Sequence, residues 1–600
     1  MLNVHMRDKF TKKKDELSSN IKGLQSKYST ISTFRVISFL LGAGLLIVGV
    51  SDDLVWAGII GAILLLTFVV LIKIHNDVAR DTDIEKSKLD VVETYLKRFN
   101  NQWRELSITG KEFVEAEDTV SLDLDLLGDN SLFQMINVAH TEDGICRLVK
   151  DMKLQELDVN KIPRRNEAIS ELMSKEDFAV DFESAGVRLS NRKKKFSVEE
   201  FSKYCEDESI GNLPGWANVI KFIAPVIFIA ACLLWVIGVF SHIIPLAVFF
   251  VILSFSWLTK TVTDRVIMPV YGIVFSLEDY LDMMEVIGEA EYKSDILQEI
   301  KNKVCGDKGA IKAFRKLKQL TQAYNIAYNP LIHQVLSGIC LWDYHIASSV
   351  CKWKSNYGKH VKDSFSAIGE MEELMSLAVI GMTRQVGWAE VLQEESKRLS
   401  LTCEELYHPL INPEQVVSNS ANIKNGITII TGSNMSGKTT FLRTLAVNLA
   451  LAYMGAPICG KKLIAGYMKI FTSMRVTDDV AHGISTFYAE ILRIKAMAEY
   501  RQLEKPMICF IDEIFKGTNS ADRIVGATEA ITKLSGDKSI AMVSTHDFEL
   551  CTITDKTGEM ATNYHFEEYY EDGELKFDYR IKDGRCTTTN ARELLKMAGF

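Results

Sequence analysis

The sequence predicts a C-terminal α/β domain, a mainly α-helical region before it and two transmembrane helical hairpins within that region. Four charge-free apolar runs occur as two close pairs in the first half of the chain. Stretches with apolar residues at helical spacing surround these pairs. Short β-branched runs that alternate with helical patterns begin near Gly426, which is typical of an α/β domain. With 600 residues, the chain is long enough for about three to five domains.

The paired apolar runs have the composition of membrane-spanning helices. The first pair covers residues 36–50 and 54–72, and the second covers 222–240 and 243–258. Each run has roughly 15 to 19 residues, close to the length of about 20 that crosses a bilayer. The runs are apolar on every side, whereas a helix in a soluble core normally has a polar stripe. We therefore favour transmembrane hairpins over the alternative of two buried core hairpins.

Lysine and arginine residues near the ends of these runs predict the orientation in the membrane. They are frequent before the first hairpin, between the hairpins and just after the second one, but neither tip, 51–53 or 241–242, contains any. Positively charged flanks normally stay on the cytoplasmic side. We therefore expect an integral membrane protein with four transmembrane helices, and with both termini and the α/β domain in the cytoplasm.

Composition narrows the kinds of site that the chain can have. A net charge of −9 argues against a protein that coats nucleic acid through bulk positive charge. The 11 cysteines are scattered singly between Cys146 and Cys586, without a CxxC pair. Neither a zinc site nor a disulfide framework is therefore predicted.

A phosphate-binding loop follows the first strand pattern of the α/β domain. Residues 427–431 read ITIIT, residues 432–439 read GSNMSGKT, and a helical pattern follows. This is the GxxxxGK[ST] motif in its strand–loop–helix context. Backbone N–H groups would wrap the phosphates, Lys438 would neutralise β- and γ-oxygens, and Thr439 would coordinate Mg²⁺. The predicted nucleotide-contacting residues are Gly432, Ser433, Asn434, Met435, Ser436, Gly437, Lys438, Thr439 and Thr440.

Two further strand patterns end in residues suited to hydrolysis. The apolar run 507–511 ends in Asp512, which can hold the Mg²⁺ water shell, and in Glu513, which can polarise the attacking water. The run 539–544 ends close to His546, where an imidazole could sense the γ-phosphate. Because these motifs end neighbouring strands, we favour this role over a structural histidine. The predicted catalytic residues are Lys438, Glu513 and His546, and the predicted metal ligands are Thr439 and Asp512.

Taken together, the motifs resemble those of the MutS family of DNA mismatch-repair ATPases. The strings that carry the resemblance are YHP (407–409), TGSNMSGKTTFLRT (431–444), FTSMR (471–475) leading to Asp478-Asp479, GISTFYAEI (483–491), DEIFKGTN (512–519), STHDFEL (544–550), YRIKDG (579–584) and ARELLKMAG (591–599). A weaker match over 126–172 resembles the start of the family's helical core. The resemblance is strong over the C-terminal domain and loose over much of 120–400.

The resemblance implies an ABC-type, MutS-like fold, with ATP and Mg²⁺ bound where two copies meet face to face in a homodimer. Ser485 and Thr486 would then reach the γ-phosphate bound by the partner subunit, and Asn434 would help to tie the two halves together. Family members usually place a phenylalanine before the phosphate loop to stack on adenine. Here Val416 and Val417 occupy that neighbourhood, so the choice between adenine and guanine stays open.

These observations divide the chain into successive segments. We expect a basic cytoplasmic tail (1–35), a transmembrane hairpin (36–72), an amphipathic helical linker (73–120), the first part of a MutS-like helical core (121–216), a second transmembrane hairpin (217–260), the second part of the helical core or lever (261–400) and a MutS-type ATPase domain (401–600). The tail and first hairpin stand where the family has its mismatch-reading domain. The sequence therefore predicts a member without that domain.

Two classes of function fit these predictions. The first is a membrane-anchored ATPase whose helical levers act on DNA in repair, with mismatched or branched DNA as candidates. The second is a nucleotide-gated membrane scaffold, or an ABC-like transport ATPase, that does not bind DNA. A transporter would normally have an LSGGQ-like signature before the acidic strand, but Leu534-Ser535-Gly536 follows that strand. The basic segment 188–195 could hold phosphate backbone or anionic lipid headgroups, or could be a solvated loop.

Overall fold

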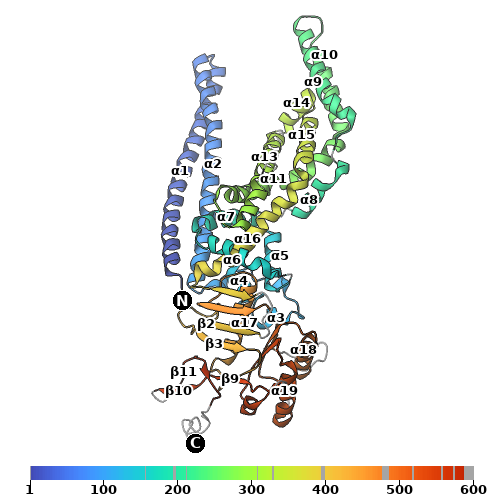
Figure 1. Ribbon diagram of the computed structural model, residues 1–600. Helices are drawn as coiled ribbons and strands as arrows, with labels where there is room; N and C mark the ends of the chain where they lie inside the picture. The colour runs from blue at the N-terminus through green and yellow to red at the C-terminus, as the bar shows by residue number, and fades with distance from the viewer. Residues whose placement is uncertain are drawn as a thin grey trace.

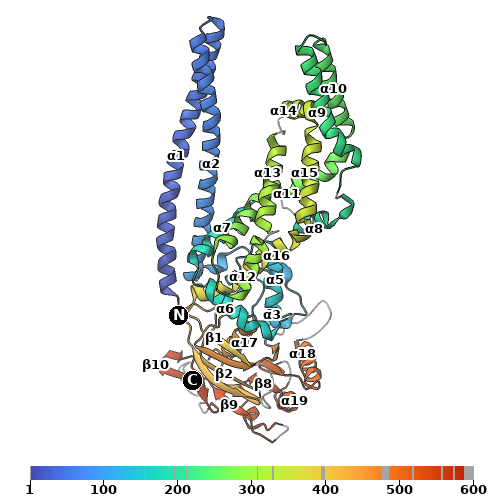
Figure 2. The same cartoon turned by 45° about the horizontal axis from the view of Figure 1, so that its top comes forward.

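The computed structural model describes residues 2–155, 157–192, 197–210, 212–306, 309–326, 330–392, 399–475, 486–516, 519–555, 558–571 and 574–586. Two helical projections extend from one side of a helical body, and an α/β domain lies on the opposite side (Figure 1). The tips of both projections point away from the α/β domain in both views (Figures 1 and 2). The expected combination of a mainly helical region and a C-terminal α/β domain is confirmed.

The first projection is a hairpin of two long helices, α1 (Val4–Ser51) and α2 (Val55–Phe99). The apolar runs form its outer half, where large side chains such as Leu40 and Val50 are exposed. Near the tip the helices touch so closely that a Cβ atom on Gly49 would lie 2.5 Å from the backbone nitrogen of Gly58. In the inner half, Phe10 stacks on Tyr95 with ring centroids 4.5 Å apart. Residues 4–35 of the expected tail and 73–99 of the expected linker are thus helical continuations of the apolar runs, whereas α2 ends at Phe99, within the expected linker.

The second projection contains α9 (Gly215–Val236) and α10 (Ile243–Leu258). Helix α9 ends before residue 240 because the backbone N–H groups of Val239 and Phe240 both donate to the carbonyl of Leu234, closing a tight turn. The chain then bends by 61° between Ile243–Leu258 and Lys260–Tyr271, the first part of α11 (Lys260–Glu289). Among the described residues, three helices (α1, α2 and α9) are long and apolar enough to cross a membrane, and the bent pair would make a fourth.

The helical body surrounds α16 (Val361–Thr383), which is almost completely buried. Helices α5, α6 and α12 pack against it. Its Glu372 carboxylate accepts hydrogen bonds from the backbone N–H groups of His140 and Thr141 at the start of α5. The other described helices of this region are α3 (Thr119–Asp123), α4 (Leu132–Ile136), α5 (Glu142–Met152), α6 (Ile162–Leu172), α7 (Glu176–Ser190), α8 (Val198–Glu206), α12 (Asp295–Cys305), α13 (Ala310–Ile326), α14 (Pro330–Cys340) and α15 (Trp342–Tyr357).

The α/β domain has a six-stranded sheet in the order β12-β9-β4-β8-β7-β6 and a four-stranded sheet in the order β1-β5-β2-β3. Strands β9, β4, β8, β7 and β6 run parallel, so their carboxyl ends meet at one edge of the sheet. Helix α17 (Lys438–Tyr453) contacts strands of both sheets, while α18 (Thr486–Arg501) contacts β6 and α19 (Ser520–Leu534) contacts β8. The strands are β1 (Trp388–Leu392), β2 (Ser400–Leu406), β3 (Asn419–Lys424), β4 (Gly426–Thr431), β5 (Lys462–Gly466), β6 (Lys469–Ser473), β7 (Met507–Asp512), β8 (Ser539–Ser544), β9 (Thr562–His565), β10 (Glu568–Glu571), β11 (Glu574–Phe577) and β12 (Lys582–Asp583).

Candidate active site

The phosphate loop connects the end of β4 to the first residue of α17. Gly432 and Gly437 have φ angles of 145° and 113°, which side chains rarely allow. A Cβ atom on Gly432 would also lie 2.6 Å from the carbonyl oxygen of Phe566. The loop therefore needs glycine at both ends, and it directs the start of α17 toward the space above the strand ends. Within the loop, the Ser433 hydroxyl donates to the Glu568 carboxylate at 2.7 Å.

Lys438 lies inside this loop rather than in solvent. Its Nζ donates to the carbonyl oxygens of Gly432 and Ser433 at 2.8 and 2.7 Å. Burial lowers the pKa of Lys438, while the nearby carboxylates of Glu513 and Asp512 act in the opposite direction. The ammonium group is thus poised where the oxygens of a bound phosphate would enter the loop.

Thr439 and Asp512 face each other across the site. The Thr439 hydroxyl donates to both carboxylate oxygens of Asp512 at 2.9 Å, and the Ser544 hydroxyl also donates to this carboxylate. One hydroxyl and one carboxylate fit the needs of Mg²⁺, which binds one or two protein oxygens and takes its other ligands from water and phosphate. The chemistry of this donor set therefore fits the expected metal.

Glu513 and His546 come together at the ends of β7 and β8. The Glu513 Oε1 atom lies 3.8 Å from His546 Nδ1, and Glu513 Oε2 lies 3.2 Å from Lys516 Nζ. His546 is half exposed, which leaves its ring accessible from the open side of the site. The residue that follows it, Asp547, forms two hydrogen bonds with Arg523 of α19, at 2.8 and 3.0 Å. Arg523 is a positioning contact that no local motif in the sequence indicated.

The predicted contacts to a partner subunit stay predictions. Thr486 is the first residue of α18, but Ser485 lies outside the described residues, as do Asp478 and Asp479. Residues 591–599, which contributed to the family resemblance, also lie outside them. Asn434 and Met435 of the phosphate loop are both exposed.

An aromatic side chain that the sequence analysis did not assign lies beside the phosphate loop. A Cβ atom on Gly437 would lie 3.3 Å from Cδ1 of Tyr579. Tyr579 has a φ of 54°, and the side-chain amide of Asn419 donates to its carbonyl oxygen at 3.0 Å. Val416, by contrast, packs against the hydrophobic core. The only earlier signal for this position was its place at the start of the YRIKDG string.

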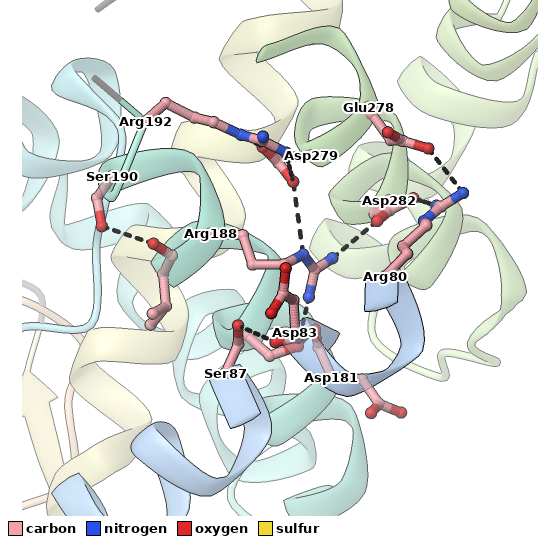
Figure 3. A network of polar contacts seen from close by, with 12 residues as sticks. Arg80, Asp83, Ser87, Asp181, Arg188, Ser190, Arg192, Glu278, Asp279 and Asp282 are labelled. Carbon is pink, nitrogen blue, oxygen red and sulfur yellow. Dashed lines mark hydrogen bonds and ion pairs between the residues drawn. The ribbon is translucent and has the colours of Figure 1, made fainter. Parts of the chain in front are cut away.

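The basic segment 188–195 begins with two arginines that form ion pairs within the protein (Figure 3). Arg188 contacts Asp282 and Asp279 at 2.7 and 3.4 Å, and Arg192 contacts Asp279 at 2.7 Å. Arg80 of α2 contacts Asp282 as well, at 3.5 Å. Arg188 and Arg192 thus join the C-terminal end of α7 to α11, and Arg80 joins α2 to the same helix, so both arginines are paired with carboxylates of this chain. The lysines at 193–195 lie outside the described residues.

Comparisons with known proteins agree with this geometry. Residues 428–600 match the family model described as MutS domain V. The DNA mismatch repair protein MutS of Staphylococcus carnosus (strain TM300) is 30% identical over 267 residues, which are 43% of this chain and 30% of that protein. The protein of the same name from Staphylococcus aureus (strain JH9) is 31% identical over 251 residues, covering 40% of this chain and 28% of its own length. The match thus spans less than a third of these relatives. The C-terminal part of the chain is thus similar to domain V of the MutS family.

Proposed function

We propose that the protein is a membrane-anchored MutS-type ATPase that binds and hydrolyses ATP with Mg²⁺ where two copies meet. The observation that carries this proposal is the convergence of Lys438, Thr439, Asp512, Glu513 and His546 at the ends of three neighbouring strands. Such an edge of a parallel sheet is the usual place for a nucleotide site.

Each residue of the site has a separate role in ATP hydrolysis. Lys438 and the backbone of the phosphate loop bind the β- and γ-phosphates, and Thr439 and Asp512 hold Mg²⁺, which neutralises phosphate charge when bound. Glu513 accepts a proton from a water molecule as the water oxygen attacks the γ-phosphorus. The bond between the γ-phosphorus and the oxygen that bridges the β- and γ-phosphates breaks. His546 donates a hydrogen bond to the γ-phosphate. ADP and inorganic phosphate are the products.

Tyr579 supplies a surface for the base of the nucleotide. Its ring lies next to Gly437, and its exposed fraction of 45% leaves a face open to a ligand. Aromatic rings stack favourably on flat heterocycles. We propose that Tyr579 takes the stacking role for which the sequence offered only Val416 and Val417.

The membrane assignment follows from exposed apolar surface on both projections. Soluble proteins rarely expose apolar patches of more than a few hundred Å². On α9, the exposed tryptophans Trp216 and Trp235 are separated by about 28 Å at the rise of an α-helix, close to the thickness of about 30 Å of a bilayer core. Tryptophan prefers such interfaces. We propose four spans with both tips outside, and both termini and the ATPase domain in the cytoplasm.

The partner that the ATPase cycle serves is proposed from the relatives, whose names refer to DNA mismatch repair. In this proposal, DNA with a mismatch or a branch binds the cytoplasmic part of a homodimer. A nucleotide-gated membrane scaffold is the second candidate. It is favoured by the ion pairs of Arg188 and Arg192, which neutralise two cations of the basic segment with carboxylates of this chain.

The test is the ATPase rate of the full-length protein in lipid nanodiscs, with and without duplex, mismatched and branched DNA at two salt concentrations. The proposal predicts Mg²⁺-dependent hydrolysis that one of these DNAs stimulates, with weaker stimulation at the higher salt concentration. Hydrolysis that no DNA alters would favour the scaffold. Absence of hydrolysis in every condition would contradict both candidates.

A further inference from the structure

The loop that carries Glu513 has a backbone that must be held in place. Glu513 and Phe515 have φ angles of 52° and 61°, in the left-handed region that residues with side chains rarely adopt. Such conformations persist only where the surrounding structure over-determines them. This loop directly follows β7, so a displacement of the loop would move the Glu513 carboxylate away from the end of the sheet.

Glu490 of α18 accepts a hydrogen bond from the backbone of this loop. Its Oε1 atom accepts a hydrogen bond from the backbone N–H of Phe515 at 2.6 Å, and the side chain is buried. Burial raises the pKa of Glu490, while hydrogen bonds from the backbone N–H groups of Phe515 and Lys516 oppose that rise. Glu490 thus fixes the residue two positions after Glu513.

Arg493, one turn further along α18, connects the same helix to the helical body. Its Nη1 donates to Asp123 Oδ2 at 2.9 Å. Asp123 ends α3, is fully buried, and also accepts hydrogen bonds from the backbone N–H groups of Met474 and Arg475, both at 3.0 Å. A single carboxylate at the end of α3 therefore binds α18 and the segment that follows β6.

We infer that Glu490 is a positioning residue for Glu513 and that the Arg493–Asp123 contact links this positioning to the helical body. This inference rests on the proposed role of Glu513. The path runs from Asp123 to Arg493, along one turn of α18 to Glu490, and through the Phe515 N–H to the Glu513 loop. Helix α3 packs against β6, and the chain continues from it to α4, which packs against α16 of the helical body. A shift of that body relative to the sheet would therefore displace Glu513 and change the rate of hydrolysis.

The first test compares Glu490→Ala and Glu490→Gln with Glu499→Gln, a control on an exposed part of the same helix. Glu490→Ala should lower kcat about 10- to 100-fold, because small misplacements of a catalytic group cost that much, with KM and ATP affinity within about twofold of wild type. Glu490→Gln retains an acceptor oxygen and should recover most of kcat. In a Glu513→Gln background, Glu490→Ala should cause little further loss, because the two changes act on one step.

A structural role for Glu490 would give a different result. Loss of ATP binding in Glu490→Ala, no recovery in Glu490→Gln, or full additivity with Glu513→Gln would each overturn the inference. Normal hydrolysis by Glu513→Gln alone would instead contradict the proposed function, so the two failures are distinguishable.

The second test concerns the link to the helical body. Arg493→Met leaves the buried Asp123 carboxylate with two backbone N–H partners but without its cation, so the free energy of unfolding is measured too, and kcat is compared where the variant is folded. We expect it to lower kcat about 3- to 10-fold at unchanged ATP affinity, with recovery in Arg493→Lys. Lys495→Met, on an exposed part of α18, is the matched control. An Arg493→Met protein with wild-type kcat would show that Glu490 acts without the helical body and would remove that part of the inference.

Discussion

Replacing Arg188 by methionine should weaken the contact between α7 and α11. Arg188 lies 2.7 Å from Asp282 and 3.4 Å from Asp279, and its side chain is only 13% exposed. Methionine keeps a similar length without the charge. Loss of one partner from a buried ion pair costs about 3–5 kcal/mol, because the other charge stays buried. In Arg188→Met, Arg192 still contacts Asp279 and Arg80 still contacts Asp282. We therefore expect the free energy of unfolding to fall by about 2–3 kcal/mol.

Arg192→Met is the matched control for this prediction. The Arg192 side chain contacts the same Asp279 but is 42% exposed, and exposed ion pairs contribute about 0–1 kcal/mol. Both variants would be measured by denaturant unfolding of the full-length protein in the same detergent, with Asp282→Asn added for a double-mutant cycle. A coupling of about 1–3 kcal/mol between Arg188 and Asp282 is expected. Equal losses in the two arginine variants, or a coupling near zero, would refute the reasoning.

Three other predictions follow from individual residues. Burial, assisted by nearby Arg443 and Arg475, lowers the pKa of His408 to about 3, so this histidine stays neutral in the folded protein while the unfolded chain binds a proton below its ordinary pKa of 6.5. The free energy of unfolding should therefore fall as pH drops below that value. Between pH 7 and pH 5, the free energy of unfolding of His408→Asn should fall by about 2 kcal/mol less than that of wild type, as measured by denaturant unfolding at each pH. Tyr579→Ala should raise the Kd for ATP about 10-fold, while Tyr579→Phe should bind ATP normally in a fluorescence titration. A cysteine introduced at Asp53 or His242 should react with an impermeant thiol reagent in intact cells, whereas one at Lys193 should not; labelling at position 193 would contradict the four-span topology.

The sequence was informative wherever a feature depends on neighbouring residues. The strand that ends at Thr431, the glycines of the phosphate loop and the helix that starts at Lys438 are adjacent in the chain, so one motif predicted all three. The apolar runs predicted the helices of both projections for the same reason. The helices extend beyond the runs, as α1 and α2 do in the first projection. Within the runs, the main difference is the end of α9, because the turn that closes on the Leu234 carbonyl lies within an apolar run and changes no hydropathy signal.

Contacts between distant segments had no such signal. The Asp123 carboxylate meets the backbone of Met474 and Arg475, which lie more than 300 residues away in the chain, and backbone donors carry no sequence pattern. Arg188 and Arg192 looked like a free basic patch because their partners Asp279 and Asp282 lie on another helix. Such pairings become visible only once the helices pack.

The central claim is that Glu513 activates water in a site that binds ATP independently of it. The most direct measurement is a comparison of ATP binding and single-turnover hydrolysis for wild type, Glu513→Gln and Lys438→Ala in nanodiscs. We predict that Glu513→Gln binds ATP with Mg²⁺ at wild-type affinity but hydrolyses it at least about 100-fold more slowly, while Lys438→Ala binds ATP weakly. Near-normal turnover by Glu513→Gln would contradict the account.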